Sequence, residues 1–148
     1  MRYRDVVLKP MWLVLLLVAA TLQGCALFVS HYDAGAYQQF TSLKAFHLKL
    51  LEDNKEADGK SFDEAKMKNA CDAGQLKFLE ATEYAAGKKD ETRVKAINYL
   101  HNAFSKDCEL GKKKFFSADY VDQQAGQLKT NYDLAIQGET SRVGAPTK

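Results

Sequence analysis

Apolar side chains recur every three or four residues between residues 33 and 138, which is the spacing of one face of an α-helix. Polar stretches divide this region into four segments. Each segment is therefore predicted to form an amphipathic helix with one buried face. The predicted buried positions are Ala36, Phe40, Leu43, His47 and Leu50 in the first helix; Met67, Cys71, Gly74, Phe78, Ala81 and Ala85 in the second; Val94, Ile97, His101, Phe104, Cys108, Gly111 and Phe115 in the third; and Val121, Ala125, Leu128, Tyr132 and Ala135 in the fourth.

Polar residues that favour helix N-termini stand before these segments. Their side-chain oxygens accept hydrogen bonds from the first free backbone N–H groups of a helix. The predicted N-caps of the first, third and fourth helices are Asp33, Asp90 and Ser117. Before the second helix, Ser61 followed by Glu64 has the spacing of a capping box, which predicts that this helix opens at Phe62.

Four long helices joined by short connections predict an all-α fold, an antiparallel four-helix bundle. Both prolines lie outside the predicted helices, so no residue forbids helices of this length. We expect one domain, over residues 33–138, because the chain left after removal of a leader is long enough for a single core. Residues 139–148 are predicted to form a disordered tail.

The N-terminal segment has the features of an export signal. Arg2, Arg4 and Lys9 precede an apolar run from residue 11 to residue 22, and Gly24 supplies the small residue that a cleavage point needs. A membrane-spanning helix needs about 20 apolar residues, so this run is short for a permanent span. Residues 1–24 are therefore predicted to be a signal peptide.

The end of this segment, Leu22-Gln23-Gly24-Cys25, resembles the lipobox of bacterial lipoproteins. The resemblance implies that diacylglyceryl is attached to Cys25, that the mature chain begins there, and that residues 25–32 form a lipidated linker. It also implies an outer-membrane location facing the periplasm, since the second mature residue is Ala26 rather than Asp. The alternative is an ordinary secretory signal or a short membrane anchor with an unmodified Cys25.

Two further cysteines, Cys71 and Cys108, would then lie in an oxidising compartment, where an even pair suggests a disulfide. The second and third predicted helices turn near Lys88 and Lys89. Cys71 precedes that turn by about 17 residues and Cys108 follows it by about 20, which places them at nearly the same height in an antiparallel pair. The sequence therefore predicts a Cys71–Cys108 disulfide; two buried free thiols are the alternative.

The charge of the chain excludes some partners. The chain has 21 basic and 19 acidic residues, which gives a formal net charge of +2, and the two extra basic residues belong to the predicted signal segment. The remaining chain is balanced, which gives no electrostatic basis for binding nucleic acid. We also expect no small-molecule substrate and no cofactor.

Motifs typical of enzymes do not occur in the sequence. It contains no Gly-x-Ser-x-Gly, His-Glu-x-x-His, P-loop or dinucleotide-binding pattern. His47 and His101 fall on predicted core faces, and a bundle core can hold a metal or haem, so a shared site is one alternative. Neither histidine has the Glu-x-x-His spacing of bundle metal sites, and we expect hydrogen-bonded core histidines in a protein that is not an enzyme.

One short run combines positive charge with aromatic side chains. Lys112, Lys113 and Lys114 precede Phe115 and Phe116. Lysines also favour the C-terminal end of a helix dipole, which is the structural alternative. The functional interpretation is a contact site for an acidic partner, formed by Lys112, Lys113, Lys114 and Phe116 at the end of the bundle away from the membrane. Tyr99 lies off the predicted core face and is a further candidate for partner contact.

These features favour a lipid-anchored envelope protein that acts as a non-enzymatic, protein-binding adaptor. The expected architecture resembles that of pilotins, the small outer-membrane lipoproteins of secretion systems. An immunity or phage- and plasmid-exclusion lipoprotein that occludes a partner is the first alternative. A metal- or haem-binding bundle is the second.

Overall fold

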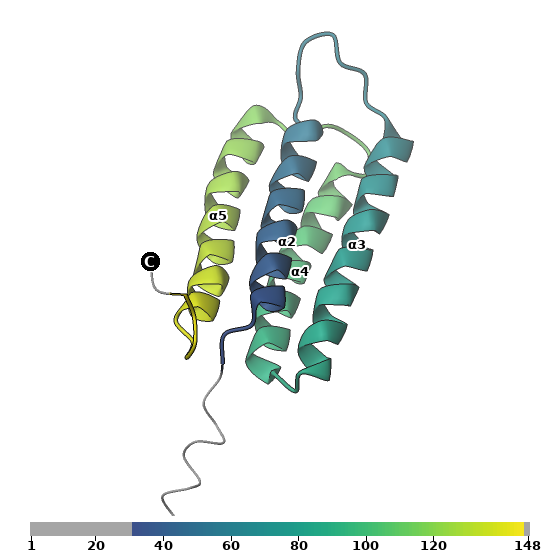
Figure 1. The fold of residues 1–148 in the computed structure, drawn as a ribbon. Helices are drawn as coiled ribbons and strands as arrows, with labels where there is room; N and C mark the ends of the chain where they lie inside the picture. Colours follow the sequence, from purple (N-terminus) through teal and green to yellow (C-terminus); the bar gives the residue numbers. More distant parts are fainter. Residues whose placement is uncertain (1–30, 147–148) are drawn as a thin grey trace, which may run out of the picture. The chain divides into compact units, whose positions relative to one another are not determined.

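The computed structural model describes residues 31–146, which form an up-and-down bundle of four helices (Figure 1). The predicted signal peptide, Cys25 and residues 26–30 of the predicted linker lie outside the described residues. The helices are α2 (Ala34–Asp53), α3 (Glu64–Gly87), α4 (Glu91–Gly111) and α5 (Ala118–Thr140). The predicted all-α four-helix bundle is confirmed. Within the described part of the chain, no helix is both long and apolar enough to cross a bilayer.

Three of the four predicted N-caps are confirmed. The Asp33 carboxylate accepts from the backbone N–H groups of Gly35 and Ala36, and Asp90 and Ser117 cap α4 and α5. The prediction for α3 was wrong, because Asp63 rather than Ser61 caps this helix. The Asp63 carboxylate accepts from the Lys66 N–H at 2.9 Å, and its negative charge also favours the positive end of the helix dipole.

The predicted core faces of α2 and α3 are all buried, whereas only Ile97, Phe104, Cys108 and Gly111 are buried on the face predicted for the third helix. Val94, His101 and Phe115 are only half-buried. In their place, α4 buries Arg93, Leu100 and Asp107. Apolar spacing alone predicts that charged side chains lie on the surface. Here Arg93 and Asp107 have polar partners inside the bundle, and these partners offset the cost of burying their charges.

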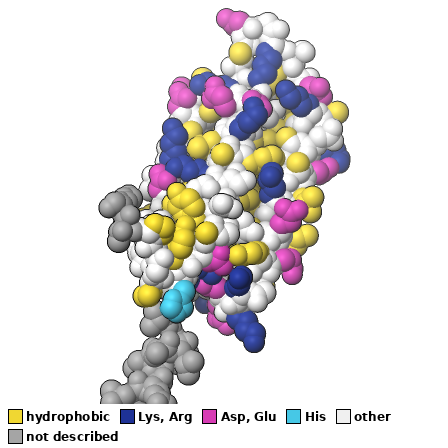
Figure 2. All heavy atoms as spheres, in the orientation of Figure 1, with side chains coloured by type: hydrophobic (Ala, Val, Ile, Leu, Met, Phe, Trp, Pro, Cys, Tyr) yellow, Lys and Arg dark blue, Asp and Glu magenta, His cyan; other side chains and the backbone are white. Residues whose placement is uncertain are grey.

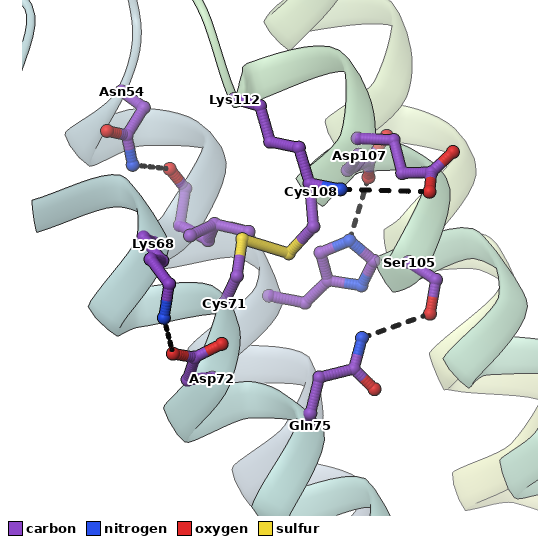
Figure 3. The surroundings of a disulfide bond; sticks show 12 residues. Asn54, Lys68, Cys71, Asp72, Gln75, Ser105, Asp107, Cys108 and Lys112 are labelled. Carbon is purple, nitrogen blue, oxygen red and sulfur yellow. Dashed lines mark hydrogen bonds and ion pairs between the residues drawn. A yellow bond between two sulfur atoms is a disulfide. The ribbon is translucent and has the colours of Figure 1, made fainter. Parts of the chain in front are cut away.

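The α3–α4 pair is held by close packing and by a disulfide. A Cβ atom at Gly74 would overlap the ring of Phe104, so only glycine permits this approach. Cys71 and Cys108 form the predicted disulfide, with their Cα atoms 5.8 Å apart (Figure 3). The prediction of this bridge is confirmed.

The first residues of the predicted tail, 139–148, belong to a helix. Helix α5 continues to Thr140, and the side chain of Glu139 is 1% exposed. Beyond the helix, the Val143 carbonyl accepts a hydrogen bond from the Tyr32 N–H at 2.9 Å. Residues 139 and 140 therefore belong to the bundle, because Glu139 is a buried partner of Arg93 and Asp33.

Candidate functional site

A pocket of about 620 Å³ opens at the end of the bundle where α2 and α4 finish and α3 and α5 begin. Its lining comes from the connection between α2 and α3, the end of α4, the connection between α4 and α5, and the start of α5. The lining residues are Glu56, Phe62, Leu110, Lys113, Lys114, Phe115, Phe116, Ser117 and Tyr120. We refer to this end as the pocket end.

Backbone hydrogen bonds fix the floor of the pocket at Phe116. The Phe116 N–H donates to the Asn54 carbonyl at 2.9 Å, and the Glu56 N–H donates to the Phe116 carbonyl at 2.8 Å. Asn54 is itself buried, and its side-chain amide donates to the Leu50 carbonyl at 2.8 Å. These bonds join the connection after α2 to the connection before α5, so two distant segments of sequence build one surface.

Phe116 serves mainly as a core residue. It is 4% exposed and stacks on the ring of Tyr120 at 5.4 Å between centroids. A Cβ atom at Gly111 would lie 2.7 Å from the Phe116 ring, so glycine allows Phe116 to lie against the end of α4. The sequence placed Phe116 among the partner contacts; the structure places it at the floor of the pocket rather than on an exposed face.

Two aromatic rings form one wall. Phe62 and Phe115 meet edge to face, with centroids 5.4 Å apart. The ammonium group of Lys60 lies 5.0 Å from the centre of the Phe115 ring, within the range of a cation–π interaction. Phe62 reaches this position because α3 begins two residues after it rather than at it.

The lysines predicted to contact a partner divide into two groups. Lys112 lies 3.8 Å from the Glu109 carboxylate on the exposed surface of α4. Lys113 and Lys114 are exposed, line the pocket and have no ion pair within residues 31–146. In the space-filling view (Figure 2), basic side chains gather with hydrophobic and acidic ones towards the end that carries the long connection after α2. The pocket therefore combines apolar walls with the exposed ammonium groups of Lys113 and Lys114.

Tyr120 connects the pocket to a buried polar network. Its hydroxyl donates to Asp107, which also accepts from Gln124 at 3.1 Å and from His47 Nε2 at 2.8 Å. His47 Nδ1 lies 3.2 Å from the Tyr132 hydroxyl. Burial and the hydrogen bond to Asp107 raise the pKa of Tyr120, so it stays a neutral donor. The position of Tyr120 in the pocket is thus held by residues of α2, α4 and α5 together.

The buried network has the residue types of an acid–base relay, but its position does not suit catalysis. His47, Asp107 and Tyr132 have no exposed surface. Every ring nitrogen of His47 and both oxygens of Asp107 are occupied by protein partners. In this arrangement a substrate has no access to these groups, and their role is to join three helices.

His101, the other histidine predicted on a core face, lies in a different environment. His101 stacks on Phe78 with ring centres 5.0 Å apart, and its Nε2 hydrogen-bonds to Gln75. Burial lowers the pKa of His101. The two histidines therefore have separate polar partners, and over residues 31–146 no group of three or more His, Cys, Asp or Glu side chains has an arrangement that suits a metal ion.

Tyr99, the remaining predicted contact, is 62% exposed on α4. It precedes Lys112 by 13 residues, which corresponds to about 20 Å along a helix. The structure does not bring Tyr99 into the pocket. The members of the pocket that the sequence did not single out as contacts are Glu56, Phe62, Leu110, Phe115, Ser117 and Tyr120. Phe115 and Ser117 flank Phe116 along the chain, whereas Glu56, Phe62, Leu110 and Tyr120 lie on segments that only the folded chain brings together.

The opposite end of the bundle carries a cluster of ion pairs, which we call the charged end. Arg93 donates two hydrogen bonds to Glu139, at 2.9 and 2.7 Å, and also lies 3.1 Å from Asp90. Arg142 pairs with Asp90 and lies 3.3 Å from Glu139. The Asp33 N–H donates to Glu139 at 2.8 Å. These contacts tie the starts of α2 and α4 to the end of α5.

Comparison with known proteins identifies no relative: no protein-family model, no curated protein and no solved structure matches this chain.

Proposed function

We propose that this protein is a lipid-anchored envelope adaptor whose helical domain binds another protein through the pocket at the end of the bundle. The sequence Leu22-Gln23-Gly24-Cys25, which resembles a lipobox, supports the anchor. The observation that carries the binding role is the pocket itself, where Lys113 and Lys114, which form no ion pair with any described residue, lie beside an aromatic wall.

The composition of the lining supports binding rather than chemistry. Most of its side chains are aromatic, aliphatic or lysine. Of its two hydroxyl groups, that of Ser117 accepts from the Tyr120 N–H at 3.3 Å as an N-cap, and that of Tyr120 donates to Asp107. The arrangement offers an apolar surface and charge to a partner, without a nucleophile placed beside a base.

The position of the pocket also suits a tethered adaptor. The described chain joins the bundle at the start of α2, and this helix of 20 residues leads to the pocket end. At 1.5 Å per residue, the pocket lies about 30 Å along the bundle from that start. A chain anchored through residues before Tyr32 would therefore present the pocket at the end farther from its point of attachment.

Site-specific photo-crosslinking of the full chain in its native envelope tests this proposal. A photoreactive residue at Leu110, which is 57% exposed at the pocket, is expected to crosslink one protein in high yield. The same residue at Leu134, which is 62% exposed on α5 and outside the pocket lining, is the matched control. The adduct at Leu110 should disappear when Lys113 and Lys114 are both changed to Glu. Equal crosslinking at both positions, or an adduct that survives the charge reversal, would contradict the proposal.

A further inference from the structure

We infer that the pocket recognises an acidic peptide segment that carries one large apolar side chain. This inference rests on the proposed adaptor function and adds the chemistry of the partner. Charge around the pocket indicates the acidic part, and the aromatic wall indicates the apolar part.

Positive side chains outnumber negative ones in the lining of the pocket. Lys113 and Lys114 have no ion pair among the described residues. The ammonium group of Lys60 donates to the backbone carbonyls of Asp53 and Lys55, so no carboxylate is bonded to it within residues 31–146. Glu56 is the one acidic side chain among the lining residues. Among the lining residues two ammonium groups, of Lys113 and Lys114, stand against one carboxylate, and Lys60 lies beside the Phe115 ring, so the site favours carboxylates on the partner.

The apolar part of the pocket needs a matching side chain. The pocket has a volume of about 620 Å³, which exceeds the volume of a single large side chain. Its apolar surface comes from Phe62, Phe115 and Leu110. Burying an aromatic or leucine side chain there removes apolar area from water on both surfaces. Such an anchor would sit between the aromatic wall and the stacked rings of Phe116 and Tyr120.

The pocket is held in shape before a partner arrives. Phe116 is fixed by its two backbone hydrogen bonds, and Tyr120 by its bond to the buried Asp107. A preorganised site loses little conformational entropy on binding. The lysines are exposed and long, so they can meet carboxylates at several places, and we expect selection for acidity around the anchor rather than for one fixed sequence.

An anionic lipid surface is the competing ligand, and the shape of the site disfavours it. A membrane presents a broad polyanionic plane, whereas the apolar walls here surround a hollow that also contains the Glu56 carboxylate. A peptide can place one side chain in this hollow and set its carboxylates beside the lysines. The peptide is therefore the better fit.

Binding of synthetic peptide pools to the purified full chain in detergent tests the inference. The test pool has nine residues, with Asp or Glu on both sides of a central Phe, Trp or Leu. One control pool replaces the acids by Asn and Gln, and another replaces the centre by Gly. The test pool is expected to bind at least tenfold more tightly than either control pool, by fluorescence anisotropy. The preference should weaken as salt rises.

Charge-reversal variants supply the control for net charge. The double change Lys113→Glu and Lys114→Glu is expected to reduce binding of the test pool at least tenfold. The double change Lys106→Glu and Lys129→Glu alters net charge equally at exposed positions outside the pocket lining, and it should leave binding within twofold. Equal effects of both double changes would overturn the assignment to this pocket.

The remaining outcomes separate this inference from the proposed function. Equal binding of the neutral pool, or binding of none of the pools, would overturn the acidic-peptide chemistry, while a specific adduct at Leu110 would still support the adaptor. Displacement of the test pool by detergent micelles that contain phosphatidylglycerol, but not by micelles that contain phosphatidylcholine, would favour the lipid surface instead. The absence of both the adduct and peptide binding would overturn both proposals.

Discussion

At the charged end of the bundle, Arg93 and Glu139 face each other with side chains that are 6% and 1% exposed, and Asp90 and Arg142 complete the cluster. At the pocket end, Lys113 and Lys114 are exposed and have no ion pair among the described residues. At the first end these four charged groups pair with one another. At the second, the two ammonium groups stay exposed to solvent, which is what the proposed binding role requires.

The difference follows from the cost of removing charge from water. A buried ion pair is tolerated only when each charged group finds well-placed partners, so the charged end uses its side chains to hold helices together. An exposed lysine pays no such cost and contributes little to stability. Variants at the charged end should therefore change the free energy of unfolding, whereas variants at the pocket end should change binding.

The largest loss of stability is expected for Glu139→Ala. This change leaves the buried Arg93 guanidinium without its main partner, and breaking a buried pair in this way costs about 3–5 kcal/mol. Denaturant unfolding followed by circular dichroism measures the effect. The double variant Glu139→Leu with Arg93→Met removes both charges and should recover part of the loss. A loss below about 1 kcal/mol in the single variant would show that the cluster is not a structural lock.

The disulfide, which joins α3 to α4 between the two ends, should rank next. Replacing Cys71 and Cys108 together by Ser is expected to reduce the free energy of unfolding by about 2–4 kcal/mol under oxidising conditions. Under reducing conditions the variant and the parent should unfold at nearly the same denaturant concentration. An equal difference in both conditions would mean that the bond does not account for the loss.

The pH dependence of stability should report the charged end and not the pocket end. Burial raises the pKa of Asp90, but the hydrogen bond from Arg142 and the charge of Arg93 outweigh it and hold the pKa below its ordinary value. The stability that this carboxylate contributes is fully present above the unfolded pKa of about 4 and is lost as the pH falls through the lower folded pKa. Asp33, whose pKa is also lowered, behaves in the same way.

Asp90→Asn should therefore lose less stability than the parent between about pH 5 and pH 2. Unfolding by urea at a series of pH values measures this slope. In the Lys113→Glu and Lys114→Glu double variant, the charged end is unchanged, so the free energy of unfolding should fall with pH near pH 4 as it does in the parent. The two new carboxylates are exposed and add only their own titration. A parental slope in Asp90→Asn would place the acid sensitivity elsewhere in the chain.

The smallest effect on stability is expected for that double variant itself. Both side chains are exposed and unpaired within the described residues, so the free energy of unfolding at neutral pH should change by less than about 0.5 kcal/mol. Thermal unfolding followed by circular dichroism checks this value. A large loss would show that the lysines stabilise the end of α4 through its dipole, which is the structural alternative for this run.

Several features of the fold were predictable because they depend on local sequence. The caps Asp33, Asp90 and Ser117 act within one turn of their helices, and the apolar spacing of α2 and α3 matches the faces that are buried. The disulfide was predictable because an antiparallel hairpin places Cys71 and Cys108 at the same height. Each of these features follows from helix geometry and a short range of sequence.

The buried charges and the pocket were not predictable in this way. Arg93, Asp107 and Glu139 lie inside because partners from other helices satisfy them, and apolar spacing carries no sign of those partners. Phe62 and Tyr120 line the same pocket as the two lysines, Lys113 and Lys114. This depends on the backbone hydrogen bonds that join the connection after α2 to Phe116.

The sequence by itself thus determined the helices, their direction and the position of the bridge, since these depend on periodicity and rise per residue. It also supplied the lipobox-like segment on which the proposed anchor rests. Only the tertiary structure decided which charges are enclosed and which remain exposed, because solvent exposure depends on neighbours that are distant along the chain.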